Sequence, residues 1–493
     1  MSGSEGWLSI RRLIRNWISL SGILLALASI FAFLLLFVLD ITSGHGNPYM
    51  GIVAYVVTPA FLFLGIGFVV LGVWLQYRQE RRAVPGVPAI SWSVDLKRPR
   101  DRKILVGFIA ASVVFLLLTA IGSYQTYHYT ESVQFCGQVC HVPMQPEHIS
   151  YLHSPHARVD CVECHVGSGA EAYVKTKING MRQLWHLTRN DFPRPITMNS
   201  TTLRPARETC EHCHWPQKFS GSLDKTYRHF LSDEKNTPFS VRLLLNVGGG
   251  GGGMYHAAQG IHWHIDAANK VEYAYEDEQQ QKIPWIRVTD AEGNAREFRD
   301  PEFKGDLKKL PVHTMDCIDC HNRPSHNLLP PDETIDRAMA AGRIDRSLRS
   351  VRSNIMNALT ATYGTKDEAL RKIEDSLRTA YPGHDPRVDA AIAEAKAIYG
   401  VNFFPEMKAD WRAYPNNIGH KVWNGCFRCH DGKHVAEGGK QMKATDCNSC
   451  HLIIAQGSDA DMAKLNPKGH DFIHIDAPYA ELSCKDCHTG AAP

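Results

Sequence analysis

Long apolar runs alternate with short basic stretches in the first quarter of the chain. Residues 18–39 form an uncharged run of 22 residues, residues 52–77 one of 26, and residues 104–121 one of 18 that continues into a weakly polar segment. A helix needs ~20 apolar residues to cross a bilayer. The pattern therefore predicts three transmembrane helices, over about residues 18–39, 52–77 and 104–123. A signal peptide is the alternative for the first run, but its apolar core is too long for one.

Basic residues flank these runs unevenly, which predicts the orientation of the helices. Three arginines precede the first run, the loop over residues 40–51 has no Lys or Arg, and eight basic residues lie within residues 78–103. After the third run, the next basic residue is Arg158. Because cytoplasmic loops carry the excess of Lys and Arg, we expect the N-terminus and residues 78–103 in the cytoplasm. Everything after Tyr124 is then outside.

The more polar remainder of the chain shows two kinds of periodicity. Residues 331–400 carry apolar residues at helical spacing, which predicts a set of helices. Residues 238–298 contain short stretches rich in strand-forming residues, with a turn at residues 290–294, which predicts a small β insertion. Six glycines at residues 248–253 are either a flexible linker or a place where the backbone must pass close to another group.

Cysteines indicate the chemistry. Six pairs read Cys-x-x-Cys-His, the spacing of covalent c-type haem attachment. The remaining two of the 14 cysteines have one extra residue between them and are also followed by histidine. Disulfides and zinc sites are the alternatives, but seven such pairs with no cysteine left over favour seven covalent haems. The predicted attachment residues are Cys136, Cys140, Cys161, Cys164, Cys210, Cys213, Cys317, Cys320, Cys426, Cys429, Cys447, Cys450, Cys484 and Cys487.

Histidines are numerous enough to supply two axial ligands to most of these haems, which suits electron transfer because such an iron has no open position. Of the 25 histidines, those in the motifs are the predicted proximal ligands: His141, His165, His214, His321, His430, His451 and His488. Local patterns favour as distal ligands His156, His186, His264, His326, His420, His434 and His474. In "IHWHI", His262 and His264 would share one face of a strand. They would serve one iron or two, and we favour His264.

Charge and haem number together place the protein. The formal net charge is only +3, so no nucleic-acid partner is expected. Covalent haems are attached on the outer side of a bacterial inner membrane, which agrees with the orientation predicted from the basic residues. We therefore expect a multi-pass protein of the bacterial inner membrane with its haem domain in the periplasm.

The order of elements after residue 104 resembles the NapC/NirT family of membrane-anchored, quinol-oxidising cytochromes c. A membrane helix leads into four haem sites, Met144 follows the first site, and "CHVGSGAEAYVKTKINGMRQLWH" follows the second. The resemblance covers about residues 104–330. The two additional membrane helices and the further three haem sites resemble the heptahaem inner-membrane cytochromes of metal-respiring bacteria.

This resemblance implies a quinol pocket and an unusual first haem. The family pocket uses a lysine after site two, which Lys175 and Lys177 match; a solvated helix face or contact with haem propionates is the alternative for both. The acidic partner expected beyond the lysine is displaced here, because the first one is Asp191. In some family members a methionine after the first motif binds the iron. We accordingly favour Met144 slightly over His141 as the ligand of the first haem.

We expect a mainly α-helical protein with little regular secondary structure. Residues 1–103 would hold two transmembrane helices and a cytoplasmic loop, residues 104–330 the third helix and a four-haem module, residues 331–400 a helical connector, and residues 401–493 a three-haem module. The predicted function is oxidation of menaquinol or ubiquinol and electron transfer to periplasmic cytochromes or reductases. An electron-transfer subunit among other respiratory-complex subunits, and a catalytic reductase of nitrite or hydroxylamine, are the alternatives.

Overall fold

The structure is a computed structural model that forms two compact units. The first comprises residues 1–132 and 166–185, and the second residues 133–165 and 186–493. The residues described are 16–42, 58–82, 97–166, 170–196, 205–215, 219–248, 260–266, 268–442, 450–475 and 484–491. Cys447, the glycine run after Gly248 and most of the predicted cytoplasmic loop lie outside these residues.

Three long helices and part of a fourth make up the first unit: α2 (Trp17–Thr42), α4 (Thr58–Arg82), α5 (Pro99–Glu131) and the first part of α8 (Ala170–Arg189). Among the residues described, two segments are long and apolar enough to cross a membrane, Trp17–Leu34 and Thr58–Gln79. The third predicted span lies within α5, a continuous helix of 33 residues that is not one of these two. Two rather than three of the predicted spans are therefore identified, and the side chains of α5 are described only in part.

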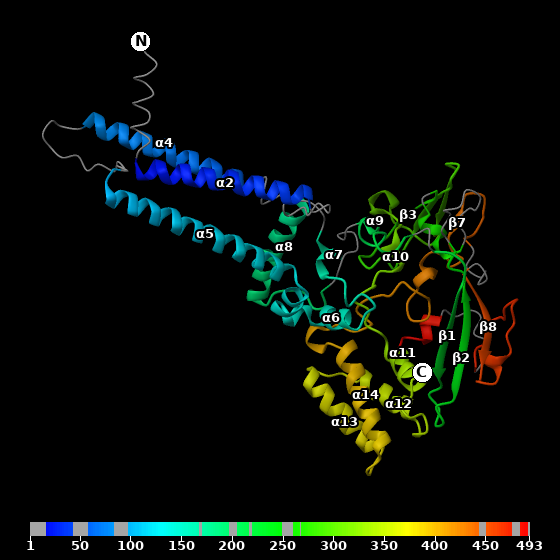
Figure 1. The fold of residues 1–493 in the computed structure, drawn as a ribbon. Coiled ribbons are helices and arrows are strands. Elements are labelled where there is room, and N and C mark those ends of the chain that lie inside the picture. The colour runs from blue at the N-terminus through cyan, green and yellow to red at the C-terminus, as the bar shows by residue number, and fades with distance from the viewer. Residues whose placement is uncertain are drawn as a thin grey trace. The chain divides into compact units, whose positions relative to one another are not determined.

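α2 and α4 pack side by side in opposite directions through small residues (Figure 1). A Cβ atom added to Gly22 would lie 2.5 Å from the carbonyl oxygen of Gly65, so only glycine permits this backbone approach. Hydroxyl groups add hydrogen bonds across the same interface, from Ser19 Oγ to the carbonyl oxygen of Val69 at 3.3 Å and from Ser29 Oγ to that of Thr58. Such bonds satisfy polar groups that an apolar environment would otherwise leave unpaired.

Two antiparallel sheets lie in the second unit, and both join early and late parts of the chain. A three-stranded sheet has the order β1–β2–β8, and a five-stranded sheet the order β6–β3–β4–β5–β7. The strands are β1 (Leu223–Phe230), β2 (Pro238–Leu245), β3 (Lys270–Ala274), β4 (Trp285–Thr289), β5 (Ala295–Arg299), β6 (Val312–Thr314), β7 (Val435–Ala436) and β8 (His451–Gly457). Because β7 and β8 come from the predicted three-haem module and pair with β5 and β2, the two predicted modules share both sheets.

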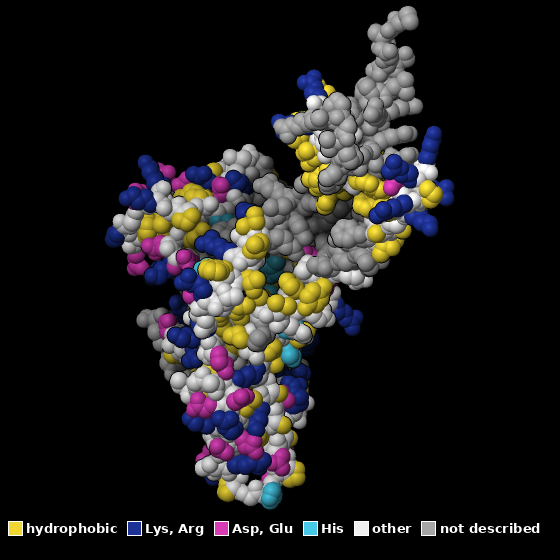
Figure 2. Space-filling view, turned by 90° about the vertical axis from the view of Figure 1, so that its left-hand side faces the viewer, with side chains coloured by type: hydrophobic (Ala, Val, Ile, Leu, Met, Phe, Trp, Pro, Cys, Tyr) yellow, Lys and Arg dark blue, Asp and Glu magenta, His cyan; other side chains and the backbone are white. Residues whose placement is uncertain are grey.

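Four helices fill the predicted connector: α11 (Pro331–Ala340), α12 (Val351–Thr360), α13 (Lys366–Ala380) and α14 (Pro386–Asn402). The start of α13 is capped by Thr365, whose hydroxyl accepts from the Glu368 amide at 3.2 Å. Apolar residues spaced four apart, such as Ile355 and Leu359 of α12 or Ala369 and Ile373 of α13, are fully buried in a shared core. The outer surface at the lower end of Figure 2, where these helices lie, mixes basic and acidic side chains, as amphipathic helices require.

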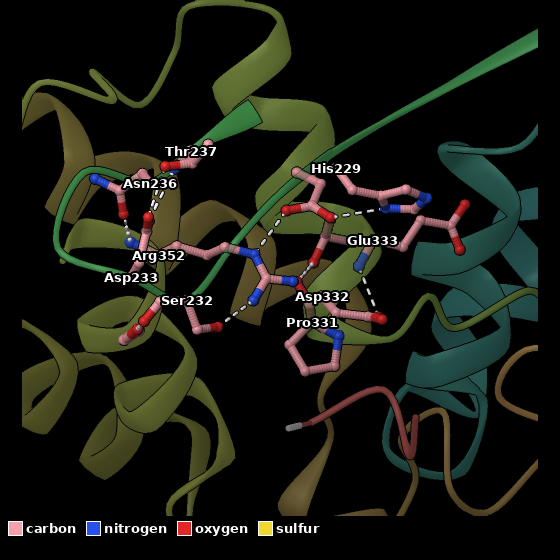
Figure 3. Close-up of polar contacts among 12 residues, drawn as sticks. His229, Ser232, Asp233, Asn236, Thr237, Pro331, Asp332, Glu333 and Arg352 are labelled. Carbon is pink, nitrogen blue, oxygen red and sulfur yellow. Dashed lines mark hydrogen bonds and ion pairs between the residues drawn. The ribbon is translucent and has the colours of Figure 1, made fainter. Parts of the chain in front are cut away.

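A buried ion pair ties the connector to the three-stranded sheet (Figure 3). Arg352 of α12 donates from Nε to Asp336 Oδ1 of α11 at 2.8 Å, and both side chains are less than 5% exposed. Arg352 Nη1 also donates to Ser232 Oγ at 2.6 Å, just after β1. His229 of β1 contacts the second carboxylate oxygen of Asp336 through Nδ1 at 3.1 Å. Every buried charge in this group therefore has a partner.

Arg352→Ala should lower the free energy of unfolding by about 3–5 kcal/mol, because it leaves the Asp336 carboxylate buried without its cation. Urea denaturation followed by far-ultraviolet circular dichroism measures the change. Arg349→Ala is the matched control, since Arg349 pairs with Glu234 at an exposed position and should cost about 1 kcal/mol or less. Equal losses in the two variants would contradict a stabilising role for the buried pair.

Candidate haem-binding sites

Most of the attachment motifs, numbered sites one to seven in chain order, occupy single helical turns; site six lies partly outside the described residues, and its His451 begins β8. Sites two, four and seven coincide with α7 (Cys161–His165), α10 (Cys317–Cys320) and α15 (Cys484–Cys487). Site three directly follows α9 (Ala206–Thr209), and site five spans the 3-10 helix η8 (Gly425–Arg428). Two cysteines three residues apart in a helix lie on the same face. This local geometry presents both thiols of a motif to one ligand.

Site one contains an extra residue, and the structure absorbs it in a π-helical turn, η2 (Phe135–Val139). A π turn closes its hydrogen bond one residue later than an α turn, so an insertion of one residue can be accommodated without breaking the helix. Burial raises the pKa of Cys140, and the charge of Cys136 raises it further. The two thiols are therefore close to each other. The wider spacing is thus compatible with two thiols serving one ligand.

Six motif histidines each face a second histidine at nearly the same distance. The ring centroids are 5.9–6.4 Å apart in the pairs His165–His326, His214–His156, His321–His262, His430–His264, His451–His420 and His488–His474. Metal–imidazole bonds are ~2 Å long, so two rings that face each other across one metal ion have centroids about 6 Å apart. The residues present therefore fit six irons with two histidine ligands each.

Several of these imidazoles are oriented by backbone carbonyls. The Nδ1 atom of His326 lies 3.0 Å from the carbonyl oxygen of Glu147, and that of His264 lies 2.8 Å from the carbonyl oxygen of Ile261. A bond at Nδ1 fixes the ring and leaves Nε2 for a metal. Burial lowers the pKa of His165 and, together with the neighbouring Arg323, that of His326 to about 4. Both rings are therefore neutral near pH 7, as a metal ligand must be.

Of the predicted distal histidines, five lie opposite a motif histidine: His156, His264, His326, His420 and His474. His434 is different, because its Nδ1 contacts Asp431 at 2.8 Å and its Nε2 contacts the carbonyl oxygen of Ile283 at 2.6 Å. Both of its ring nitrogens therefore have protein partners, and in the described part of the chain His434 faces no motif histidine. His186 contacts Asp191 through Nδ1 at 2.8 Å, and among the described residues it pairs with no motif histidine.

The sequence favours His264 over His262, and the local conformation explains why each of the two faces a different motif histidine. We expected a strand, in which residues two apart share a face. The segment is instead a 3-10 helix, η5 (Ile261–Ile265). With three residues per turn, His262 and His264 point in different directions. They face His321 of site four and His430 of site five, respectively.

Thiols of successive sites are close enough to influence each other. A hydrogen bond from Cys136 lowers the pKa of Cys161 to about 7, which places sites one and two side by side. Burial, followed by the charge of Cys210, raises the pKa of Cys317 to about 11, so sites three and four are neighbours. Burial raises the pKa of Cys429, and the charge of Cys320 of site four raises it further. Sites four and five are therefore neighbours as well.

The iron ligand of site one has three candidates on one helix, α6 (His141–Leu152). Met144 and His148 follow His141 by three and seven residues, a spacing that places all three on one helical face. Met144 is half-buried, and the side chain of His141 lies outside the described part of the structure. A Cβ atom added to Gly137 would lie 2.4 Å from Cδ2 of His148, so this imidazole rests directly on the attachment motif. Sequence reasoning missed His148, although its seven-residue spacing from His141 was visible.

The predicted quinol lysines lie on α8, which presents an apolar surface to its surroundings. Four large side chains are more than half exposed: Ile178, Met181, Leu184 and Trp185. Lys175 is exposed near them, and the side chain of Lys177 is not described. Asp191, the displaced acidic residue, contacts His186 and Arg189 at 2.8 and 2.9 Å. These contacts, the one with His186 foremost, lower the pKa of Asp191.

Comparisons with known proteins agree with the attachment motifs. Residues 98–214 match the description "NapC/NirT cytochrome c family, N-terminal region". Across 97% of this chain and 96% of the relative, the sequence is 39% identical to "Cytochrome c-type protein ImcH" of Geobacter sulfurreducens. No solved structure matches the chain.

Proposed function

Since the chain belongs to the NapC/NirT-type multihaem cytochromes c, together with ImcH, we propose that it is a heptahaem quinol dehydrogenase. In this proposal it oxidises quinol, with menaquinol as the first substrate to test, and delivers electrons to periplasmic cytochromes or reductases. The haems supply one-electron transfer. The observation that carries the proposal is the set of six histidine pairs with centroids 5.9–6.4 Å apart.

Two histidines at each of these six positions argue for electron transfer rather than catalysis at iron. A metal with both axial positions filled has no place for a small substrate. We assign the motif histidines as proximal ligands and their facing partners as distal ligands, which adds His262 to the predicted set. The close thiols of sites one and two, three and four, and four and five support electron transfer between these neighbouring sites.

For the membrane we propose three crossings, with α5 as the third. Its apolar run over residues 104–121 is part of an unbroken helix of 33 residues. The basic residues before α5 and their scarcity after it support a cytoplasmic N-terminus and a periplasmic haem domain. The compact unit that contains α2, α4 and α5 also includes residues 166–185. This grouping supports a position of the first part of α8 at the membrane surface.

The number of haems is a direct test. Intact mass spectrometry of the purified protein should exceed the mass of the apo chain by seven haem groups, because all seven cysteine pairs are followed by histidine. The double variant Cys136→Ser, Cys140→Ser should carry six. A wild-type mass with six haems would show that the widened motif at site one is not an attachment site.

The iron of site one should depend on Met144. A methionine ligand raises the reduction potential relative to two histidines, so Met144→Ala should lower the potential of one haem or make that haem high-spin. Potentiometric titration with electron paramagnetic resonance measures both effects. His141→Ala and His148→Ala are the matched variants on the same face of α6, and each should have the smaller effect. A larger effect of either one would transfer the assignment to that histidine.

Quinol oxidation should depend on Lys175 or Lys177. A protonated lysine would donate a hydrogen bond to a quinol oxygen and stabilise the negative charge that develops as the hydroxyl loses its proton. Loss of a charge-assisted bond worth ~1.5–3 kcal/mol in the transition state should slow the reaction by about one to two orders of magnitude. The measurement is the oxidation rate of a menaquinol analogue by the double alanine variant.

Lys464→Ala is the control for this experiment, since Lys464 is an exposed lysine paired with Asp461 at 3.2 Å. Its rate should equal that of the wild type, and the haem spectra should be unchanged in every variant. A wild-type rate in the double lysine variant would place the quinol pocket elsewhere.

A further inference from the structure

Arg323, a cation next to site two, has the charge of Glu147 nearby, but among the residues described its buried Nε atom makes no hydrogen bond. The buried Oε2 of Glu147 likewise has no partner among these residues. The guanidinium carbon lies 4.2 Å above the ring of Tyr414, a contact that leaves the hydrogen-bond donors of the group unused. The side chain as a whole is partly exposed in the protein alone. It therefore adjoins a space that another group can fill.

A comparison with Arg352 shows how unusual this is. Arg352 is buried, and it donates from Nε to Asp336 and from Nη1 to Ser232, whereas the buried Nε of Arg323 has no acceptor in the described part of the structure. A buried charge without hydrogen bonds costs several kcal/mol, and buried polar groups in folded proteins nearly always have partners. The unused donors of Arg323 accordingly point to a bound anion.

The surroundings of Arg323 identify which site that anion belongs to. His326 follows three residues later, and Arg323 contributes, after burial, to lowering the pKa of His326. The ring of His326 faces His165 of site two with centroids 6.0 Å apart. The planar fork of an arginine matches the two oxygens of a carboxylate. A c-type haem carries two propionate carboxylates, so the cofactor expected at site two brings an acceptor for the hydrogen-bond donors that Arg323 leaves unused.

We propose that Arg323 binds a propionate of the haem at site two and makes this haem easier to reduce than it would be without that positive charge. A fixed positive charge in a poorly solvated place stabilises the additional negative charge of a reduced centre. Site two adjoins site one through Cys136 and Cys161. The effect would draw electrons away from the entry haem. This inference rests on the proposed function, because it assumes that electrons enter at site one.

The test uses the full-length holoprotein with Arg323→Leu and Arg323→Lys. In Arg323→Leu, the reduction equilibrium of one haem should shift at least tenfold toward the oxidised form, which is a fall of about 59 mV in its potential. Arg323→Lys keeps the charge but loses the planar fork, so the same haem should shift in the same direction by less. Spectroelectrochemical titration with electron paramagnetic resonance resolves the individual haems, and intact mass confirms their number.

Arg412→Leu is the matched control. Its guanidinium also lies over an aromatic ring, that of Trp411 at 4.6 Å, but it is already paired with Asp410, so no potential should change. Unchanged potentials in Arg323→Leu with all haems present would overturn the proposal. If Arg323→Leu does not accumulate, Arg323→Lys decides in the same way. A wild-type protein that fails to oxidise quinol would instead refute the proposed function and leave these potentials interpretable.

Discussion

The separation of about 6 Å between facing imidazoles is the constraint on which the second unit depends. Each pair brings together residues that are often far apart in the chain, such as His165 with His326 and His451 with His420. The elements between them are short, with helical turns of four or five residues at most attachment motifs. The largest apolar core of the described residues lies mainly in the helical connector. Around the histidine pairs, the proposed porphyrins would supply the apolar material that the chain does not.

The attachment sites follow from local sequence, whereas the pairing of histidines and of strands does not, because it depends on tertiary contacts. Cysteine spacing indicates attachment because it depends on one helical turn. The partner of each motif histidine depends on tertiary packing, which local sequence does not show. The pattern around His434 therefore favours it as a distal ligand, although both of its ring nitrogens contact protein groups. The sequence favours His264 over His262 as a distal ligand, because it predicts a strand where a 3-10 helix forms. The pairing of β7 and β8 with strands from the other predicted module leaves no local signal at all.

The helical hairpin of α2 and α4 is a separate structural element. The match to the NapC/NirT description begins at residue 98, one residue before α5 starts, so the hairpin lies outside it. Its glycine contacts and the hydroxyl bonds of Ser19 and Ser29 make it self-complementary. The contacts between its two helices thus come from residues outside the part of the chain that matches the family description.

Several motif histidines face a histidine that lies in another part of the chain, and this affects the order in which the haem ligands are synthesised. In the proposed topology the chain is exported from its N-terminal side, and His165 emerges long before His326, which lies beyond the motifs of sites three and four. His262 and His264, in contrast, are already outside when the motifs of sites four and five arrive. Some irons would therefore meet their final partner at once, while the iron of site two must wait through much of synthesis. During that delay another histidine could bind the iron of site two. The order in which the histidines leave the membrane would therefore affect the order in which the haems acquire their final ligands.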